Sequence, residues 1–183
     1  MWNVVTLDGC FEGEKPWDLS FHNLVWGAEL EALGMTQLQE ADMLVFGKNT
    51  YTGMAEYWTN AKNDDPHVAK YMNTLPKIVC SRTLKQAEWN NTKIINDAVP
   101  DLTKIKSEGN GPMYIFGSAN LSESLLNAGI LDEIRLCVAP VILGAGRRLF
   151  TDRNMKRSLK LRDAKTLSNG GIVLTYECLT DNK

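Results

Sequence analysis

The sequence predicts an α/β fold of three layers (α/β/α), in which helices cover both faces of a mainly parallel mixed sheet that ends in an antiparallel C-terminal hairpin. Two observations predict it. Runs rich in β-branched residues alternate with helical patterns as far as residue 129, which is typical of βαβ units. Strand patterns then follow one another without helices, and Asn169-Gly170-Gly171 between the last two is a strong hairpin signal.

The elements of the α/β part follow from hydrophobic runs and their end signals. Helices end at Gly109 and Gly129, because glycine readily adopts the conformation that closes a helix, and Pro66 stands near the first turn of another. In chain order we expect a strand at 2–7, a helix at 23–39, a buried strand at 43–46, a helix at 50–58, a loop and helix start at 63–67, strands at 77–81 and 92–96, a helix at 100–109, a strand at 113–117 and a helix at 118–129.

The last third predicts strands at 131–143, 158–167 and 171–179. No stretch resembles a linker, and 183 residues with 44% hydrophobic side chains suffice for one sizeable core. We therefore expect a single domain over residues 1–183.

Composition excludes several classes of protein. A net charge of -2 does not suit a nucleic-acid binder. No apolar run reaches the roughly 18 residues of a membrane span, and no secretory signal opens the chain, so we expect a cytoplasmic protein. Four separated cysteines without a CxxC pair and only two histidines predict no metal site.

Polar residues follow three predicted strands directly, at Gly47-Lys48-Asn49-Thr50, Ser81-Arg82-Thr83 and Gly117-Ser118-Ala119-Asn120. In an open α/β sheet, ligands bind beyond the carboxyl ends of the strands. Glycine allows close approach, helix amides donate hydrogen bonds, and Lys48 and Arg82 add positive charge. Each segment alone is more readily a plain turn. Together they favour a phosphorylated nucleotide cofactor.

Three motifs carry a resemblance to a known family: "VFGKNTYTGM" (45–54), "KIVCSRTL" (77–84) and "YIFGSANLSESLLNAGILDEIRLCVAPVILGAGRRLF" (114–150). The chain resembles the dihydrofolate reductase superfamily, most closely the branch related to the reductase domain of bacterial riboflavin biosynthesis proteins. "VTLDG" (5–9) is similar to the S-x-D-G opening of that branch.

The resemblance implies a dihydrofolate-reductase-like fold and NADPH as cofactor. It implies that Lys48 and Arg82, with Ser81 and Thr83 beside them, contact the adenosine 2′-phosphate. The pyrophosphate then lies against two helix starts, formed by Gly47, Asn49 and Thr50 and by Phe116, Gly117, Ser118, Ala119 and Asn120. Phe116 departs from the family, whose dihydrofolate-reducing members often have a glycine there.

The segment "EKPWDLSFHNLVW" (14–26) resembles the part of dihydrofolate reductases that lines the folate pocket. His22 falls where those enzymes carry an acidic residue, and an imidazole cannot accept two hydrogen bonds as a carboxylate does. His22 is thus a candidate proton donor, with an ordinary pKa near 6.5, or a helix cap. Asp18 is the alternative acid, or a solvated residue.

Aromatic and apolar side chains are candidates for a substrate pocket, although plain core is the commoner role of such residues. The candidates are Trp17, Trp26, Met54, Tyr57 and Trp58. Arg147 and Arg148 either contact a substrate phosphate or lie in solvent.

Two classes of function remain open. The first is an NADPH-dependent reductase; by resemblance its substrate is 5-amino-6-(5-phosphoribosylamino)uracil, with dihydrofolate or another heterocycle or carbonyl compound as alternatives. The second is a non-catalytic nucleotide-binding module. The resemblance also implies a homodimer, and the apolar strand at 131–143 is one candidate for its interface.

Overall fold

The computed structural model describes residues 1–60, 66–109 and 111–179. The chain divides into two compact units: unit 1 comprises Met1–Glu31 and Ser122–Lys183, and unit 2 comprises Ala32–Leu121. Both boundaries fall inside helices, one in α1 (Ala28–Glu40) and one in α5 (Ala119–Asn127). The single domain over 1–183 stays a prediction.

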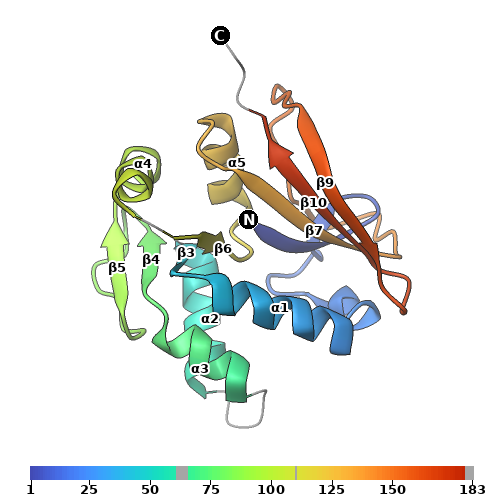
Figure 1. Cartoon of the computed structure of the whole chain (residues 1–183), viewed down its shortest axis with the longest axis horizontal. Coiled ribbons are helices and arrows are strands. Elements are labelled where there is room, and N and C mark those ends of the chain that lie inside the picture. The colour runs from blue at the N-terminus through green and yellow to red at the C-terminus, as the bar shows by residue number, and fades with distance from the viewer. Residues whose placement is uncertain (61–65, 110, 180–183) are drawn as a thin grey trace. The chain divides into compact units, whose positions relative to one another are not determined.

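Unit 2 is built on a four-stranded sheet whose strands all run parallel, in the order β5-β4-β3-β6 (Figure 1). The strands alternate with helices along the chain, as the sequence predicts. Besides parts of α1 and α5, the elements are β3 (Met43–Gly47), α2 (Lys48–Asn60), α3 (Pro66–Thr74), β4 (Lys77–Cys80), β5 (Thr92–Ile95), α4 (Ala98–Glu108) and β6 (Met113–Ile115).

Both faces of this sheet carry buried apolar side chains. Successive side chains of a strand point to opposite sides of the sheet, and apolar residues of its strands occupy both sides. On one face, Leu44, Phe46 and Val79 pack with Leu38 of α1 and Tyr51 of α2. The opposite face carries buried Val45 and Ile78. On that face the carboxylate of Asp101, on α4, contributes to raising the pKa of the Cys80 thiol, after the larger effect of burial. Helices therefore cover both faces of the sheet within unit 2.

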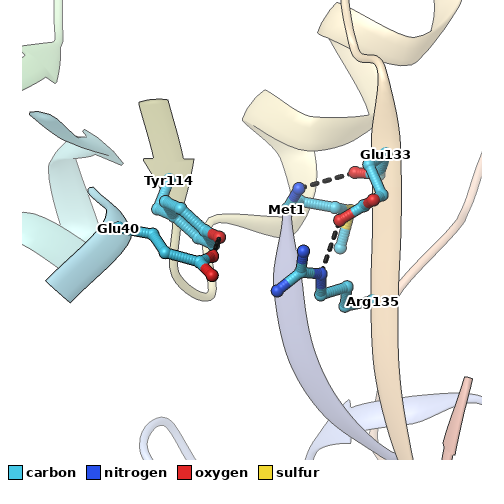
Figure 2. Close-up of polar contacts among 5 residues, drawn as sticks. All are labelled: Met1, Glu40, Tyr114, Glu133 and Arg135. Carbon is cyan, nitrogen blue, oxygen red and sulfur yellow. Dashed lines mark hydrogen bonds and ion pairs between the residues drawn. The ribbon is translucent and has the colours of Figure 1, made fainter. Parts of the chain in front are cut away.

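A polar contact ties α1 to β6 inside unit 2. The hydroxyl of Tyr114 donates to Oε2 of Glu40 at 2.9 Å (Figure 2). The ring of Tyr114 is buried and stacks on Phe116, with 6.1 Å between ring centroids.

Unit 1 contains a second four-stranded sheet in the order β1-β7-β10-β9. β1 pairs parallel with β7, and β10 pairs antiparallel with both of its neighbours. The backbone nitrogen of Met1 donates to the carbonyl of Glu133 at 2.7 Å and extends the first ladder (Figure 2). The elements are β1 (Trp2–Thr6), β2 (Cys10–Glu12), a 3-10 helix η1 (Ser20–Leu24), β7 (Glu133–Ala139), β8 (Arg147–Arg148), β9 (Leu159–Thr166) and β10 (Ile172–Cys178).

The C-terminal hairpin is confirmed. β9 and β10 pair antiparallel around Asn169-Gly170-Gly171, where Gly170 has a φ of 91° and the amide of Leu167 donates to the carbonyl of Gly171 at 2.8 Å. The mixed α/β fold class is likewise confirmed. In the described residues the hydrogen-bonded ladders form three sheets, the third being the small pair β2-β8.

β7 differs from its prediction in length and in surroundings. It ends at Ala139 rather than at residue 143, because Pro140 has no N–H to continue a ladder. It also lies between β1 and β10, so both of its edges are already paired. An interface formed by pairing a second copy along this strand is therefore excluded, whereas the homodimer itself stays a prediction.

Other boundaries were misjudged at short or irregular segments. α1 begins at Ala28 instead of residue 23, after η1, and the carbonyl of Gly27 accepts its first hydrogen bonds. β2 and β8 were not predicted. The helix start at Pro66 is confirmed, while the loop part of that prediction, 63–65, lies outside the described residues. None of the helices in the described ranges has the length and apolar character needed to cross a membrane.

Candidate functional site

Three turns of unit 2 lie at one edge of its sheet. β3, β4 and β6 are parallel neighbours, so their carboxyl ends meet at the same edge, where ligands of open α/β sheets bind. β3 leads directly into α2, since Gly47 ends the strand and Lys48 begins the helix. The structure thus brings together the three segments that the sequence singled out.

The turn after β3 and the turn after β6 are joined by two hydrogen bonds, which we call the α2–α5 clasp. The amide of Gly47 donates to Oγ of Ser118 at 3.0 Å, and the amide of Ser118 donates to Oγ1 of Thr50 at 3.1 Å. Each bond links a backbone amide of one helix start to a hydroxyl of the other. The clasp therefore fixes the first turns of α2 and α5 side by side.

The backbone of the clasp is held in an unusual conformation. Gly117 and Ser118 have φ angles of 61° and 54°, and a positive φ at a non-glycine residue is uncommon. A Cβ atom at Gly117 would lie 3.1 Å from Cγ2 of Thr50, tighter than ordinary contact. Residues held in such conformations cluster at ligand clamps, and here glycine is required both for the angle and for the space.

Phe116 does not occupy the clasp. Its ring is packed against the hydrophobic core of unit 2 and stacks on Tyr114. The close approach that a first glycine provides in some family members therefore depends on Gly117 here. Phe116 borders the turn through its backbone, and its cofactor role stays a prediction.

The turn after β4 is organised by a buried serine. Oγ of Ser81 accepts hydrogen bonds from the amides of Thr83 and Leu84, at 3.2 and 3.0 Å. Nζ of Lys48 donates to Oγ1 of Thr83 at 2.9 Å and so joins this turn to the start of α2. Ser81 stabilises the turn, while Lys48 brings a cation to it.

Arg82 has an acidic partner that the sequence interpretation missed. Its Nη2 lies 2.8 Å from Oδ1 of Asp97, the residue at the start of α4. Asp97 follows the strand predicted at 92–96, so the strand-end rule would also have found it, had it been applied to that strand. Of the two cations that the sequence singled out at this edge, Arg82 is thus paired with a carboxylate.

The donor set suits phosphate. The first amides of α2 and α5 have no partner within their helices and carry partial positive charge. Asn49 and Asn120 are exposed at these two helix starts, and Ala119 contributes only backbone, because its side chain is buried. The three turns supply N–H groups, hydroxyls and cations, and Asp97 at the start of α4 adds a carboxylate beside them. Such a set fits the pyrophosphate and the 2′-phosphate of a dinucleotide.

The predicted substrate residues divide between the two units. Met54 and Trp58 pack against the core of unit 2, which is the plain-core alternative for both. Tyr57 is 52% exposed, and its ring packs perpendicular to that of Trp58, with 4.9 Å between the ring centroids. The other candidates, Trp17, Trp26, Asp18 and His22, belong to unit 1.

Trp17 is held by a carboxylate that the sequence did not point to. Its φ is 64°, and its amide donates to Oε1 of Glu12 at 2.6 Å. Oε2 of the buried Glu12 pairs with Nη1 of Arg147 at 2.8 Å, and Arg147 lies over the ring of Phe11. Trp17 is nevertheless 44% exposed, as is Trp26 at 57%, so the segment presents indole surface.

The two arginines considered for a substrate phosphate have partners within unit 1. Arg147 pairs with Glu12, and Nη1 of Arg148 donates to the carbonyl of Asp8 at 2.8 Å. The Asp8 carboxylate accepts from the amides of Leu143 and Gly144. Arg147 and Arg148 therefore have partners within unit 1 while both residues stay exposed, and a contact of either with a substrate phosphate stays a prediction.

Neither candidate acid is poised to donate a proton at neutral pH. Burial lowers the pKa of His22 to about 4, so its imidazole is neutral at pH 7. Among the described residues, Nε2 of His22 has no hydrogen-bond partner. Hydrogen bonds from the hydroxyl and amide of Ser20 lower the pKa of Asp18, which is therefore ionised. Their catalytic roles stay predictions that these pKa values do not support.

The buried imidazole predicts a loss of stability in acid. Because the pKa of His22 is near 6.5 when unfolded and about 4 when folded, the unfolded chain binds the proton first as the pH falls. Protonation of His22 therefore leaves the free energy of unfolding unchanged above pH 6.5. Between pH 6.5 and pH 4 it lowers that free energy, by up to about 3 kcal/mol. Urea unfolding of the chain and of His22→Leu at pH 7 and pH 4.5 measures it. An equal pH dependence of the two proteins would contradict the assignment.

Comparisons with known proteins identify the family of the chain and agree with its fold. The model of the RibD C-terminal domain family matches residues 3–173. An uncharacterised protein of Bacillus subtilis, YyaP, is 30% identical over 179 residues, which cover 94% of this chain and 90% of YyaP.

Solved structures share the fold at low identity. A putative riboflavin biosynthesis protein from a Shewanella species has a TM-score of 0.78 and 17% identity, covering 98% of this chain and 97% of that one. A Thermotoga maritima protein described as a diaminohydroxyphosphoribosylaminopyrimidine deaminase/5-amino-6-(5-phosphoribosylamino)uracil reductase has a TM-score of 0.66 and 12% identity, covering 97% of this chain and 55% of that one.

Proposed function

Because the chain belongs to the RibD C-terminal domain family, we propose that it is an NADPH-dependent reductase of a heterocyclic substrate similar to 5-amino-6-(5-phosphoribosylamino)uracil. The observation that carries this proposal is the α2–α5 clasp, in which Gly117 and Ser118 take positive φ angles and two helix starts are fixed together. NADPH would supply the hydride, as nicotinamide cofactors do.

The residues of unit 2 have separate roles in this proposal. The first amides of α2 and α5 bind the pyrophosphate, and the clasp orients them before the cofactor arrives. Lys48 and Arg82 bind the 2′-phosphate, since charge-assisted hydrogen bonds are about twice as strong as neutral ones. Ser81 and Thr83 hold Lys48 and the turn in place.

The substrate end is proposed in unit 1, at the segment that holds His22. A neutral imidazole donates or accepts one hydrogen bond at each nitrogen, so His22 is proposed to orient a substrate carbonyl or amide. This arrangement does not favour dihydrofolate, whose aminopyrimidine edge suits a carboxylate. Exposed Trp17 and Trp26 are proposed to contact the substrate ring.

Turnover tests the proposal. The chain is mixed with NADPH and either 5-amino-6-(5-phosphoribosylamino)uracil or dihydrofolate, and oxidation of NADPH is followed by absorbance. We expect oxidation that depends on the first substrate. If NADPH is oxidised with dihydrofolate but not with 5-amino-6-(5-phosphoribosylamino)uracil, the chain is instead assigned to the dihydrofolate-reducing branch.

A second function, a non-catalytic nucleotide-binding module, rests on the state of the two candidate acids. His22 is neutral and Asp18 is ionised at pH 7, so neither supplies a proton readily. Saturable NADPH binding without turnover of any heterocycle tested would favour this second function over the reductase.

We also propose a homodimer. β9 is an edge strand of the unit 1 sheet, with β10 on its inner side, and every residue of β9 is exposed. Light scattering at micromolar concentration should give twice the 20.5 kDa mass of the chain. A mass of one chain at that concentration would contradict the homodimer.

A further inference from the structure

Asp97 stands at the start of α4 but does not cap it. A carboxylate at this position normally accepts a hydrogen bond from an amide of the first helical turn. Asp97 makes no such bond, although its own amide donates to Asp101 at 3.2 Å. Its Oδ1 accepts instead from Nη2 of Arg82 at 2.8 Å. The carboxylate of Asp97 thus binds the turn after β4 instead of the first turn of its own helix.

Lys48 differs from Arg82 in the charge of the partner that it contacts. Nζ of Lys48 contacts the neutral hydroxyl of Thr83, so its charge is not offset there. Arg82 and Asp97 are 80% and 59% exposed, which leaves the guanidinium open to a second anion. An anion that binds Arg82 from solvent also meets the negative charge of Asp97.

The two dinucleotides differ at this position. The 2′-phosphate of NADPH is a dianion or close to it, and a neighbouring carboxylate repels it. The 2′-hydroxyl of NADH is neutral and donates a hydrogen bond that a carboxylate accepts, as in many NAD sites. The same side chain therefore disfavours one dinucleotide and favours the other.

We propose that Asp97 is a specificity-determining residue that offsets Arg82 and limits the preference of the chain for NADPH over NADH. The proposal rests on the proposed function and names the group that regulates cofactor choice at that site. It assigns most of the attraction for the 2′-phosphate to Lys48.

The substitution Asp97→Asn tests it. Asparagine is an equally good residue at a helix start, so α4 is retained while the charge is removed. Dissociation constants of NADPH and NADH are measured by calorimetric titration, with adenosine 2′,5′-bisphosphate and AMP as probes of the adenosine end alone. The affinity ratio of NADPH to NADH should rise about fivefold, the low end of typical coupling because the pair is exposed.

Two controls separate this effect from a general change of charge. Glu108→Gln removes one negative charge at the other end of α4, where Glu108 pairs with Lys104, and should leave the ratio unchanged. In an Arg82→Ala background, Asp97→Asn should raise the ratio less than it does when Arg82 is present. Both results are expected if the two side chains act as one unit.

The outcomes separate the inference from the function on which it rests. An unchanged ratio in Asp97→Asn, with both dinucleotides bound, overturns the role of Asp97 alone. An equal rise in Glu108→Gln also overturns it. Failure of both dinucleotides to bind the unmutated chain overturns the proposed function together with this inference.

Discussion

Alanine at both Lys48 and Arg82 should reduce the preference of the chain for NADPH over NADH at least about tenfold. Each charge-assisted bond to a 2′-phosphate contributes on the order of 1.5–3 kcal/mol, and about 1.4 kcal/mol corresponds to a factor of ten. Because Arg82 is paired with Asp97 and Lys48 is not, Lys48→Ala alone should account for more of the loss than Arg82→Ala alone.

A matched variant controls for the change of net charge. Lys93 and Lys104 are exposed lysines of the same unit, on β5 and α4, and alanine at both should leave the ratio of affinities unchanged. Dissociation constants for the two dinucleotides give the result directly. Equal affinity of the unmutated chain for NADPH and NADH would refute the roles of Lys48 and Arg82.

Alanine at Gly117 should both destabilise unit 2 and weaken NADPH binding. A left-handed conformation costs a residue with a side chain about 1–2 kcal/mol, and the new Cβ would lie 3.1 Å from Cγ2 of Thr50. The turn must shift to relieve this contact, and the clasp bond from Ser118 to Thr50 shifts with it. Urea unfolding and NADPH titration measure the two losses.

Two further variants isolate the cause. Gly34→Ala lies within α1, where a Cβ would meet nothing within 4 Å, and should be neutral or stabilising by up to about 1 kcal/mol. Thr50→Ser removes Cγ2 but keeps the hydroxyl, so the pair Gly117→Ala/Thr50→Ser should recover the steric part of the loss. A Gly117→Ala variant as stable as the unmutated chain would contradict the account of the clasp.

The fold was predictable where local signals are strong. Buried apolar runs marked β3 and β4, and Asn169-Gly170-Gly171 marked the hairpin, because hydrophobic periodicity and turn chemistry are local properties. β2 and β8 contain three and two residues, too few for any period to appear. They depend on pairing between segments about 135 residues apart, which no local pattern encodes.

The candidate site was predictable in outline but not in its contacts. Placing Gly47, Arg82 and Gly117 at strand ends was enough to bring their turns to one edge of the sheet. The clasp between Thr50 and Ser118 joins residues 68 positions apart, and the pairing of Arg82 with Asp97 depends on the geometry of two loops. The neutral state of His22 arises from burial, which the sequence does not reveal for a single side chain.

Titration of the unmutated chain with NADPH tests the central claim most directly, namely that the clasped helix starts bind a phosphorylated dinucleotide. Calorimetry should show saturable binding of one NADPH per chain, with a dissociation constant below about 1 mM, the upper range of typical enzyme affinities, and weaker binding of NADH. Absence of binding at millimolar NADPH, from a chain that unfolds cooperatively in urea, would contradict it.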